Sequence, residues 1–177
     1  MSLTAARTWW LTGLSGAGKS TLARSLATAL RGRQQPVCVI DGDELRAGLC
    51  QDLGFDTASR AENVRRAAHM ARLLNDNGVH AVVALISPDT DARALAYTTI
   101  GRGRCVEVHV NTPLAVCEQR DPKGLYARAE RGEIKEFTGI SSPYEAPASA
   151  EVELRTDTLT AEQAVEQLLE FLAPRLE

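Results

Sequence analysis

The segment from Gly13 to Thr21 reads GLSGAGKST and matches the pattern GxxxxGK[ST]. It follows a short apolar run and opens an amphipathic stretch, which is the strand–loop–helix context that such a loop needs. The glycines let the backbone turn so that successive N–H groups surround phosphate oxygens, and the helix start adds partial positive charge. The sequence therefore predicts a phosphate-binding loop made of Gly13, Leu14, Ser15, Gly16, Ala17, Gly18, Lys19, Ser20 and Thr21.

Two side chains of this loop have defined tasks. Lys19 would reach the β- and γ-phosphates of a nucleoside triphosphate, and the Ser20 hydroxyl would ligate Mg²⁺. The alternative is a glycine-rich turn with an exposed lysine, which the complete pattern in its context disfavours. The loop predicts a nucleotide but no reaction, because motors, GTPases and small-molecule kinases share it. No guanine-selecting NKxD signature occurs and 177 residues leave little room for motor machinery, so a small-molecule kinase fits best.

Length and charge set further bounds. About 150 residues per domain is usual, so we expect one domain over residues 1–177. A net charge of −3 gives no overall attraction to nucleic acid or to an anionic membrane, so bound anions need a local cationic cluster. The longest apolar run is too short to span a bilayer, and the start MSLTAARTWWLTG lacks the features of a secretory signal. We expect a cytoplasmic protein without membrane or nucleic-acid partners.

Short apolar runs alternate with amphipathic stretches, which predicts an α/β fold with a parallel sheet in a three-layer αβα arrangement. Thr160 and Gln163 would form a capping box at the start of a closing helix. Other helices are predicted over Lys19 to Leu30 and Arg60 to Asn77. Five strands are predicted: Trp9 to Thr12, Pro36 to Ile40, Val79 to Ser87, Cys105 to Val110, and an edge strand from Glu151 to Thr156.

The stretch from Asp121 to Ala150 is rich in charge, glycine and proline and has little periodicity. Loops of this length are usually lids or binding loops, so we expect a mobile lid over about residues 121–150. The four cysteines lack metal-ligand spacing, which favours reduced and mostly buried thiols. His80 and His109 lie in apolar segments and are expected to be structural.

The second predicted strand is followed by DGDELR, so two carboxylates lie at the carboxyl edge of the sheet, where α/β enzymes bind ligands. We predict that Asp43 is a base toward an acceptor hydroxyl and that Asp41 supports the metal. Helix capping is the alternative, above all for Asp41.

Lysine is rare in this chain. Of its 20 basic residues, all but Lys19, Lys123 and Lys135 are arginines, and these three lie in the suspected site segments. Such placement favours a need for a compact charge. A local cationic cluster would combine them with Arg46, Arg60, Arg65 and Arg120, although Arg65 is also typical of a solvated helix face.

Two aromatic side chains, Phe55 and Phe137, lie in the loop sequences LGFDT and EFTGI, where burial in the core is harder. Loop aromatics in a nucleotide-handling protein favour stacking on a base. Packing back onto the domain is the alternative.

The chain resembles the adenylylsulfate kinase (APS kinase) family in a series of segments that covers nearly its whole length. These are GLSGAGKSTLA, DGDELR, LGF, RAENVRR, ISP, PLAVCEQRDPKGLYARA and IKEFTGISSPYEAP, and the last two are long and peculiar to the family. The resemblance implies a P-loop NTPase fold and, with Mg²⁺, transfer of the ATP γ-phosphoryl group to the 3′-hydroxyl of adenosine 5′-phosphosulfate (APS), giving PAPS and ADP for sulfate assimilation.

The resemblance also implies roles for individual residues. Asp43 and Arg46 would face APS, and Phe55 and Phe137 would sandwich its adenine. The remaining contacts are Arg60 and Asn63 on the phosphosulfate, Ile86 and Ser87 on the floor, Lys123, Leu125 and Lys135 on the lid, and Arg120 near ATP. A catalytic phosphoenzyme role would fall on Ser87, although in-line transfer requires only positioning and charge neutralisation.

Four residues depart from the family pattern, namely Glu44, Ser59, Asp89 and Thr90. They bear on substrate affinity and lid contacts more than on reaction class. The family is commonly dimeric, so a homodimer is an expectation that rests on the resemblance alone. Two other interpretations stay open: a P-loop kinase that phosphorylates a sugar, acid or antibiotic hydroxyl, and a nucleotide-binding module without turnover.

Overall fold

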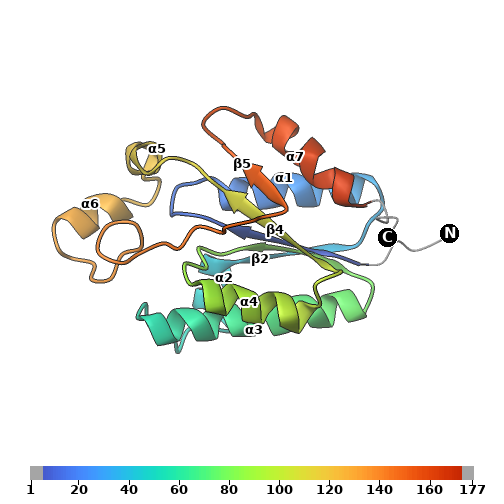
Figure 1. Cartoon of the computed structure of the whole chain (residues 1–177), viewed down its shortest axis with the longest axis horizontal. Coiled ribbons are helices and arrows are strands. Elements are labelled where there is room, and N and C mark those ends of the chain that lie inside the picture. Colours follow the sequence, from blue (N-terminus) through green and yellow to red (C-terminus); the bar gives the residue numbers. More distant parts are fainter. Residues whose placement is uncertain (1–5, 173–177) are drawn as a thin grey trace.

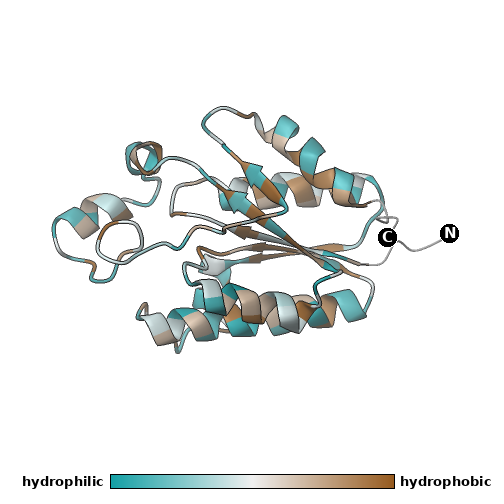
Figure 2. Cartoon of the chain, viewed as in Figure 1, coloured by the Kyte–Doolittle hydropathy of each residue, from teal (hydrophilic) through white to brown (hydrophobic). Residues whose placement is uncertain are grey.

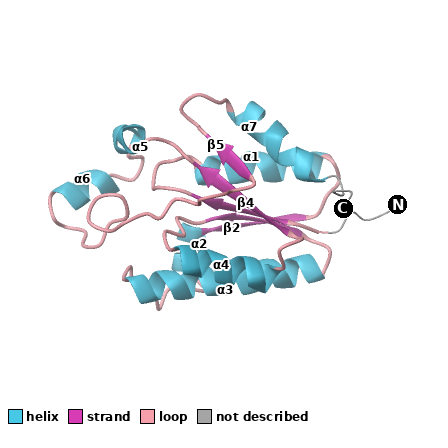
Figure 3. Cartoon of the chain, in the orientation of Figure 1, coloured by secondary structure: helices cyan, strands magenta, loops and turns pink. Residues whose placement is uncertain are grey.

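The computed structural model describes residues 6–172, in which a parallel sheet lies between two layers of helices (Figure 1, Figure 3). The strand order is β2-β3-β1-β4-β5, and neighbouring strands all pair in parallel. The predicted three-layer α/β fold is confirmed. The strands are β1 (Thr8–Thr12), β2 (Val37–Asp41), β3 (His80–Ala84), β4 (Cys105–Val110) and β5 (Val152–Leu154). The apolar run that predicted a strand to Ser87 leaves the sheet after Ala84.

Helices α1 and α7 cover one face of the sheet, and α3 and α4 cover the other (Figure 1). The helices are α1 (Lys19–Gly32), α2 (Gly42–Ala47), α3 (Thr57–Asp76), α4 (Thr90–Ile100), α5 (Leu114–Arg120), α6 (Leu125–Glu130) and α7 (Ala161–Leu169), followed by the 3₁₀ turn η1 (Glu170–Leu172). The expected capping box of Thr160 and Gln163 is confirmed at α7, whereas Leu172 lies in η1 rather than in the helix.

The sequence prediction lacks four of these helices. Three of them, α2, α5 and α6, have six or seven residues, too few to give a periodic pattern. Helix α4 has 11 residues, but its buried face consists of Ala92, Arg93, Ala96 and Ile100 instead of a stripe of large apolar side chains. Helix α6 lies inside the segment that was expected to be a loop.

The core consists of two apolar layers, one on each side of the sheet (Figure 2). Trp9 and Trp10 are neighbours on β1, and because side chains alternate along a strand, each belongs to a different layer. Their indoles donate hydrogen bonds to the Leu168 carbonyl and to Ser87 Oγ respectively. The central strand is thus anchored on both faces, and its Trp10 side is tied to the loop after β3.

The loops that follow β1, β2, β3 and β4 all leave from one edge of the parallel sheet, and α5 and α6 extend beyond that edge (Figure 1). This arrangement gathers chemistry-bearing residues from distant parts of the sequence. Among residues 6–172, no helix is long and apolar enough to cross a membrane. The sequence analysis expects no secretory signal at the start of the chain, and residues 1–5 of that start lie outside the described range.

The cysteines and the two histidines in apolar segments are structural. All four cysteines are free, and Cys50, Cys105 and Cys117 are buried. His80 Nδ1 accepts a hydrogen bond from the Arg7 backbone N–H, and burial lowers its pKa. His109 is buried with its ring stacked on Tyr144, and burial lowers its pKa as well.

Candidate active site

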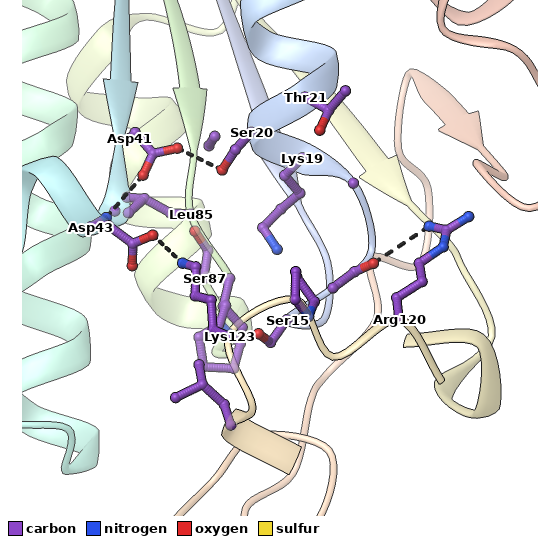
Figure 4. A pocket seen from close by; sticks show the side chains of 18 of the residues that line it. Ser15, Lys19, Ser20, Thr21, Asp41, Asp43, Leu85, Ser87, Arg120 and Lys123 are labelled. Atoms are coloured by element: carbon purple, nitrogen blue, oxygen red, sulfur yellow. Dashed lines mark hydrogen bonds and ion pairs between the residues drawn. The ribbon is translucent and has the colours of Figure 1, made fainter. Parts of the chain in front are cut away.

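A cavity of about 1100 Å³ lies at the carboxyl edge of the sheet (Figure 4). It exceeds the roughly 300–1,000 Å³ of ordinary ligand pockets, so it has room for more than one small ligand. The predicted site residues that line it are Ser15, Gly16, Gly18, Lys19, Ser20, Thr21, Asp41, Asp43, Arg46, Phe55, Arg60, Asn63, Ile86, Ser87, Arg120, Lys123, Leu125, Lys135 and Phe137. Of the predicted set, Gly13, Leu14 and Ala17 are absent from the lining. The structure therefore brings nearly all the predicted residues together.

The phosphate loop has the backbone that its glycines predict. Gly13, Gly16 and Gly18 all have positive φ angles, of 153°, 74° and 99°. A Cβ atom on Gly13 would lie 2.6 Å from the Val110 carbonyl oxygen, so the loop also depends on close approach to β4. Leu14 and Ala17 pack into the apolar layer behind the loop, which leaves their backbone as their contribution to the site.

Lys19 points into the centre of the pocket (Figure 4) and is only 8% exposed. Its Nζ donates hydrogen bonds to the carbonyl oxygens of Gly13, at 2.9 Å, and Leu14, at 2.6 Å. Burial lowers its pKa from the ordinary 10.5 to about 8. The loop thus holds a costly buried cation at the position where phosphates would neutralise it.

Asp41 caps a helix, which is the alternative that the sequence left open, and it also contacts the phosphate loop. Its Oδ1 accepts a hydrogen bond from the Asp43 backbone N–H and caps α2, while its Oδ2 accepts one from Ser20 Oγ at 2.6 Å. Asp43 lies in the first turn of α2 with a largely exposed carboxylate that forms an ion pair with Lys123 of the lid (Figure 4). The oxygen atoms of Ser20 and Asp41 and the ion-paired carboxylate of Asp43 therefore lie beside the phosphate loop.

A cationic and aromatic wall faces the phosphate loop. Phe55 is 57% exposed, and the guanidinium carbons of Arg46 and Arg60 lie 4.2 Å and 5.9 Å from its ring centroid. Arg60 donates hydrogen bonds to the carbonyls of Phe55 and Glu136, and burial lowers the pKa of both arginines. Asn63 is buried, and its Oδ1 has no protein partner. This wall offers charge and ring surface for an anionic aromatic ligand.

Phe137 differs from the expectation for a loop aromatic. It is 6% exposed and packs edge-on against Tyr126, with ring centroids 4.9 Å apart. Tyr126 and Phe137 of the lid segment both belong to the apolar cluster on one side of the sheet, and this cluster buries the ring. The argument that loop position hinders burial is wrong for Phe137 and holds for Phe55, although both rings line the cavity.

The lid is tied to the rest of the site by hydrogen bonds. The Tyr126 hydroxyl donates to the Ser15 carbonyl at 2.8 Å. Directly before the lid, at the end of α5, Arg120 donates to Oγ1 and the carbonyl oxygen of Thr156, both at 2.8 Å. The segment therefore lies folded against the phosphate loop, while its mobility stays a prediction.

Ser87 lines the floor of the cavity but is only 2% exposed. Its Oγ accepts a hydrogen bond from the Trp10 indole at 3.1 Å. The hydroxyl is thus held toward the sheet by an indole N–H.

Several other residues can now be placed. Arg65 forms an exposed ion pair with Glu62, so it belongs to a solvated helix face and not to the cationic cluster. The Ser59 hydroxyl donates a hydrogen bond to the carboxylate of Asp56, and Asp56 caps α3. Asp89 caps α4. Sequence reasoning missed Thr156, which lines the cavity beside Arg120. Its position at the carboxyl end of an expected strand could have identified it.

Comparison with known proteins identifies the family of this chain. The adenylylsulphate kinase family model matches residues 5–155. An adenylyl-sulfate kinase of Shewanella amazonensis is 51% identical over 163 residues, covering 92% of this chain and 82% of the relative. One of Bacteroides fragilis is 47% identical over 167 residues, covering 94% and 83%.

Among solved structures, the APS kinase CysC of Mycobacterium tuberculosis in complex with AMPPNP and APS superposes with a TM-score of 0.91 at 44% identity. The match covers 95% of this chain and 98% of that one. Since the family model spans most of the chain and the relatives are about half identical to it, this chain belongs to the adenylylsulphate kinase family.

Proposed function

We propose that this chain is an adenylylsulfate kinase, which transfers the γ-phosphoryl group of ATP to the 3′-hydroxyl of APS and yields PAPS and ADP. The observation that carries the proposal is one continuous cavity in which a phosphate loop faces a wall of Phe55, Arg46 and Arg60. The family membership and the ligands named for the Mycobacterium tuberculosis relative support the same reaction.

The residues of the cavity suggest how transfer proceeds. The acceptor hydroxyl oxygen forms a bond to the γ-phosphorus while the bond to the β,γ-bridging oxygen of ATP breaks, and the hydroxyl proton passes to the Asp43 carboxylate. Catalysis of this kind depends on positioning and on neutralising charge over the phosphoryl oxygens. Lys19 and the loop N–H groups would supply that charge, and the ion pair of Asp43 with Lys123 would open to admit the acceptor.

The residues around Ser20 fit a magnesium ion. Ser20 Oγ and Asp41 Oδ2 are both hard oxygen donors and lie 2.6 Å apart. Mg²⁺ usually keeps waters and substrate phosphates as its other ligands, and residues 6–172 contain no cluster of three or more acidic, histidine or cysteine ligands. We propose that Ser20 and Asp41 hold the ion, which when bound would neutralise charge on the phosphates.

The proposed reaction is tested by ADP release with different acceptors. We expect selective turnover with APS and none above background with gluconate or shikimate. Turnover with one of the other acceptors would instead identify a different P-loop kinase. ATP binding without turnover on any of the three would indicate a nucleotide-binding module, an interpretation that the intact set of Lys19, Ser20 and Asp43 disfavours.

Replacing Phe55 by alanine tests the stacking proposed for the acceptor. Base stacking on an aromatic side chain contributes about 1–3 kcal/mol, so we expect the KM for APS to rise about tenfold or more in Phe55→Ala. The KM for ATP should stay within about twofold, because the ring lies on the acceptor wall. Steady-state kinetics with each substrate varied in turn gives both constants.

Leu49→Ala is the matched control, because Leu49 is 54% exposed and lies outside the cavity lining. Equal rises in both KM values would contradict acceptor stacking at Phe55. The buried Phe137 is a less suitable target, since its truncation would also disturb the packing of the lid against Tyr126.

We also propose a cytoplasmic location. The four free cysteines are typical of a reducing compartment. Secretion of the intact protein in fractionation experiments would contradict this.

A further inference from the structure

The loop after β3 contains a backbone conformation that needs outside support. Ser87 has a φ angle of 45°, in the left-handed region that disfavours residues with a side chain. Ile86, Ser87 and Pro88 all line the cavity. A strained turn therefore forms part of the acceptor floor, and the surrounding structure must hold it in place.

Three side chains that touch this turn come from elements beneath the cavity. The Ser87 carbonyl accepts hydrogen bonds from Arg93 Nη1 at 2.7 Å and from Thr12 Oγ1 at 3.3 Å. Thr12 also donates to the Ile86 carbonyl at 2.7 Å, and Trp10 donates to Ser87 Oγ. The shortest of the bonds to Ser87 comes from Arg93, which is the one charged donor among these three side chains.

Arg93 is buried to an unusual degree for an arginine. Its side chain is 2% exposed, and its Nε lies 3.4 Å from Oε1 of Glu107 on β4, which is itself 14% exposed. Arg93 is absent from the cavity lining, so it lies behind the floor and not in it. Buried ion pairs are poor stabilisers compared with apolar side chains of similar volume. The hydrogen bond from Arg93 to the Ser87 carbonyl gives a reason for a buried guanidinium at this position.

The end of the lid segment is hydrogen-bonded to residues that directly follow Ser87. The Glu145 backbone N–H donates to the Pro88 carbonyl at 2.9 Å, and the Glu145 carboxylate accepts from the Thr90 N–H at 2.8 Å. Tyr144 shares a hydrogen bond with Thr12. The turn thus connects α4, the sheet and the chain that returns from the lid.

We propose that Arg93, held by Glu107, is a positioning residue that fixes the Ser87 turn as the floor of the acceptor site. It lies outside the cavity lining and acts through the Ser87 carbonyl. This inference rests on the proposed function, because the floor is assigned to APS binding.

Arg93→Met removes the donor while keeping an apolar stem of similar length. We expect the KM for APS to rise about tenfold or more, since small misplacements at a binding floor are costly. The KM for ATP should change less than about twofold. In ¹H–¹⁵N spectra the Trp10 indole signal should shift, whereas the Trp9 signal should not, because that indole bonds to Leu168 on the other face.

The double variant Arg93→Met/Glu107→Gln separates positioning from stability. The single change leaves the Glu107 carboxylate without its buried partner, so thermal stability should fall, and neutralising Glu107 should restore it. We expect the double variant to regain the wild-type Tm and to keep the raised KM for APS. Recovery of Tm and KM together, or an unmoved Trp10 signal in Arg93→Met, would overturn the inference.

Arg104→Met is the control, because it breaks an ion pair with Asp76 at the amino end of β4, away from the carboxyl edge where the cavity lies. It should leave the KM for APS and the Trp10 signal unchanged, and an effect like that of Arg93→Met would overturn the inference. A wild-type enzyme that fails to phosphorylate APS would refute the proposed function. The Trp10 signal would still test whether Arg93 holds the turn.

Discussion

Asp43→Ala should lower kcat by about 10²- to 10⁴-fold, which is the usual contribution of a positioned general base. The KM for ATP should change little, because the loop that would bind the phosphates keeps all its groups. The fold should also be unaffected, since the ion pair of Asp43 with Lys123 is largely exposed and such pairs contribute at most about 1 kcal/mol. Rapid-quench measurement of phosphoryl transfer at saturating ATP and APS gives the rate of the chemical step.

Glu44→Ala is the matched control for this change. Glu44 is the next residue on α2 and is also an exposed carboxylate, but it does not line the cavity. We expect near wild-type kcat for Glu44→Ala. A loss of less than about tenfold in Asp43→Ala would remove Asp43 from the role of base.

The sequence predicted the parts of this protein in which local pattern and tertiary position agree. Glycines with positive φ in the phosphate loop, a strand buried on both faces and a capping box each leave a direct mark on residue type. The carboxyl edge of a parallel sheet then collects whatever follows each strand. For this reason Asp41 and Asp43 could be assigned to one site without any knowledge of the packing, whereas Ser87 was assigned to it by the family resemblance.

Apart from the three helices that are too short to give a periodic pattern, the misses have a common physical cause, which is burial that depends on distant residues. Phe137 was expected to be accessible because its neighbours are polar, yet Tyr126 from elsewhere in the lid covers its ring. Helix α4 was missed because a buried Arg93 interrupts the apolar face that periodicity detects. The partner that makes this burial tolerable, Glu107, lies on another strand and cannot be inferred from the local sequence.

Among the features of the composition, the rarity of lysine was the most informative about the site. Lys19, Lys123 and Lys135 all line the cavity, in a chain whose other basic residues are arginines. A compact ammonium can be buried at the cost of a lowered pKa, whereas a guanidinium stays charged. The burial of Lys19 has this consequence.

Lys19→Met should change activity and stability in opposite directions. Loss of the cation that faces the transferred phosphoryl group should lower kcat by about 10³-fold, the upper end for one preorganised donor. In the absence of nucleotide, however, the variant should be more stable than wild type at neutral pH. Burial holds the pKa of Lys19 at about 8 instead of 10.5, so the folded state binds the proton less tightly than the unfolded chain does.

The sign of the pH dependence follows from this difference. Between the folded pKa of about 8 and the unfolded value of 10.5, the unfolded chain carries a proton that the native protein lacks, so wild-type stability rises with pH by up to about 3 kcal/mol. Lys19→Met has no such group. Its excess free energy of unfolding over wild type should be largest below pH 8 and should disappear by about pH 10. Urea unfolding of both proteins at a series of pH values measures the gap. A gap independent of pH would show that the fold does not penalise the charge on Lys19, and an unchanged kcat would remove this residue from phosphoryl transfer.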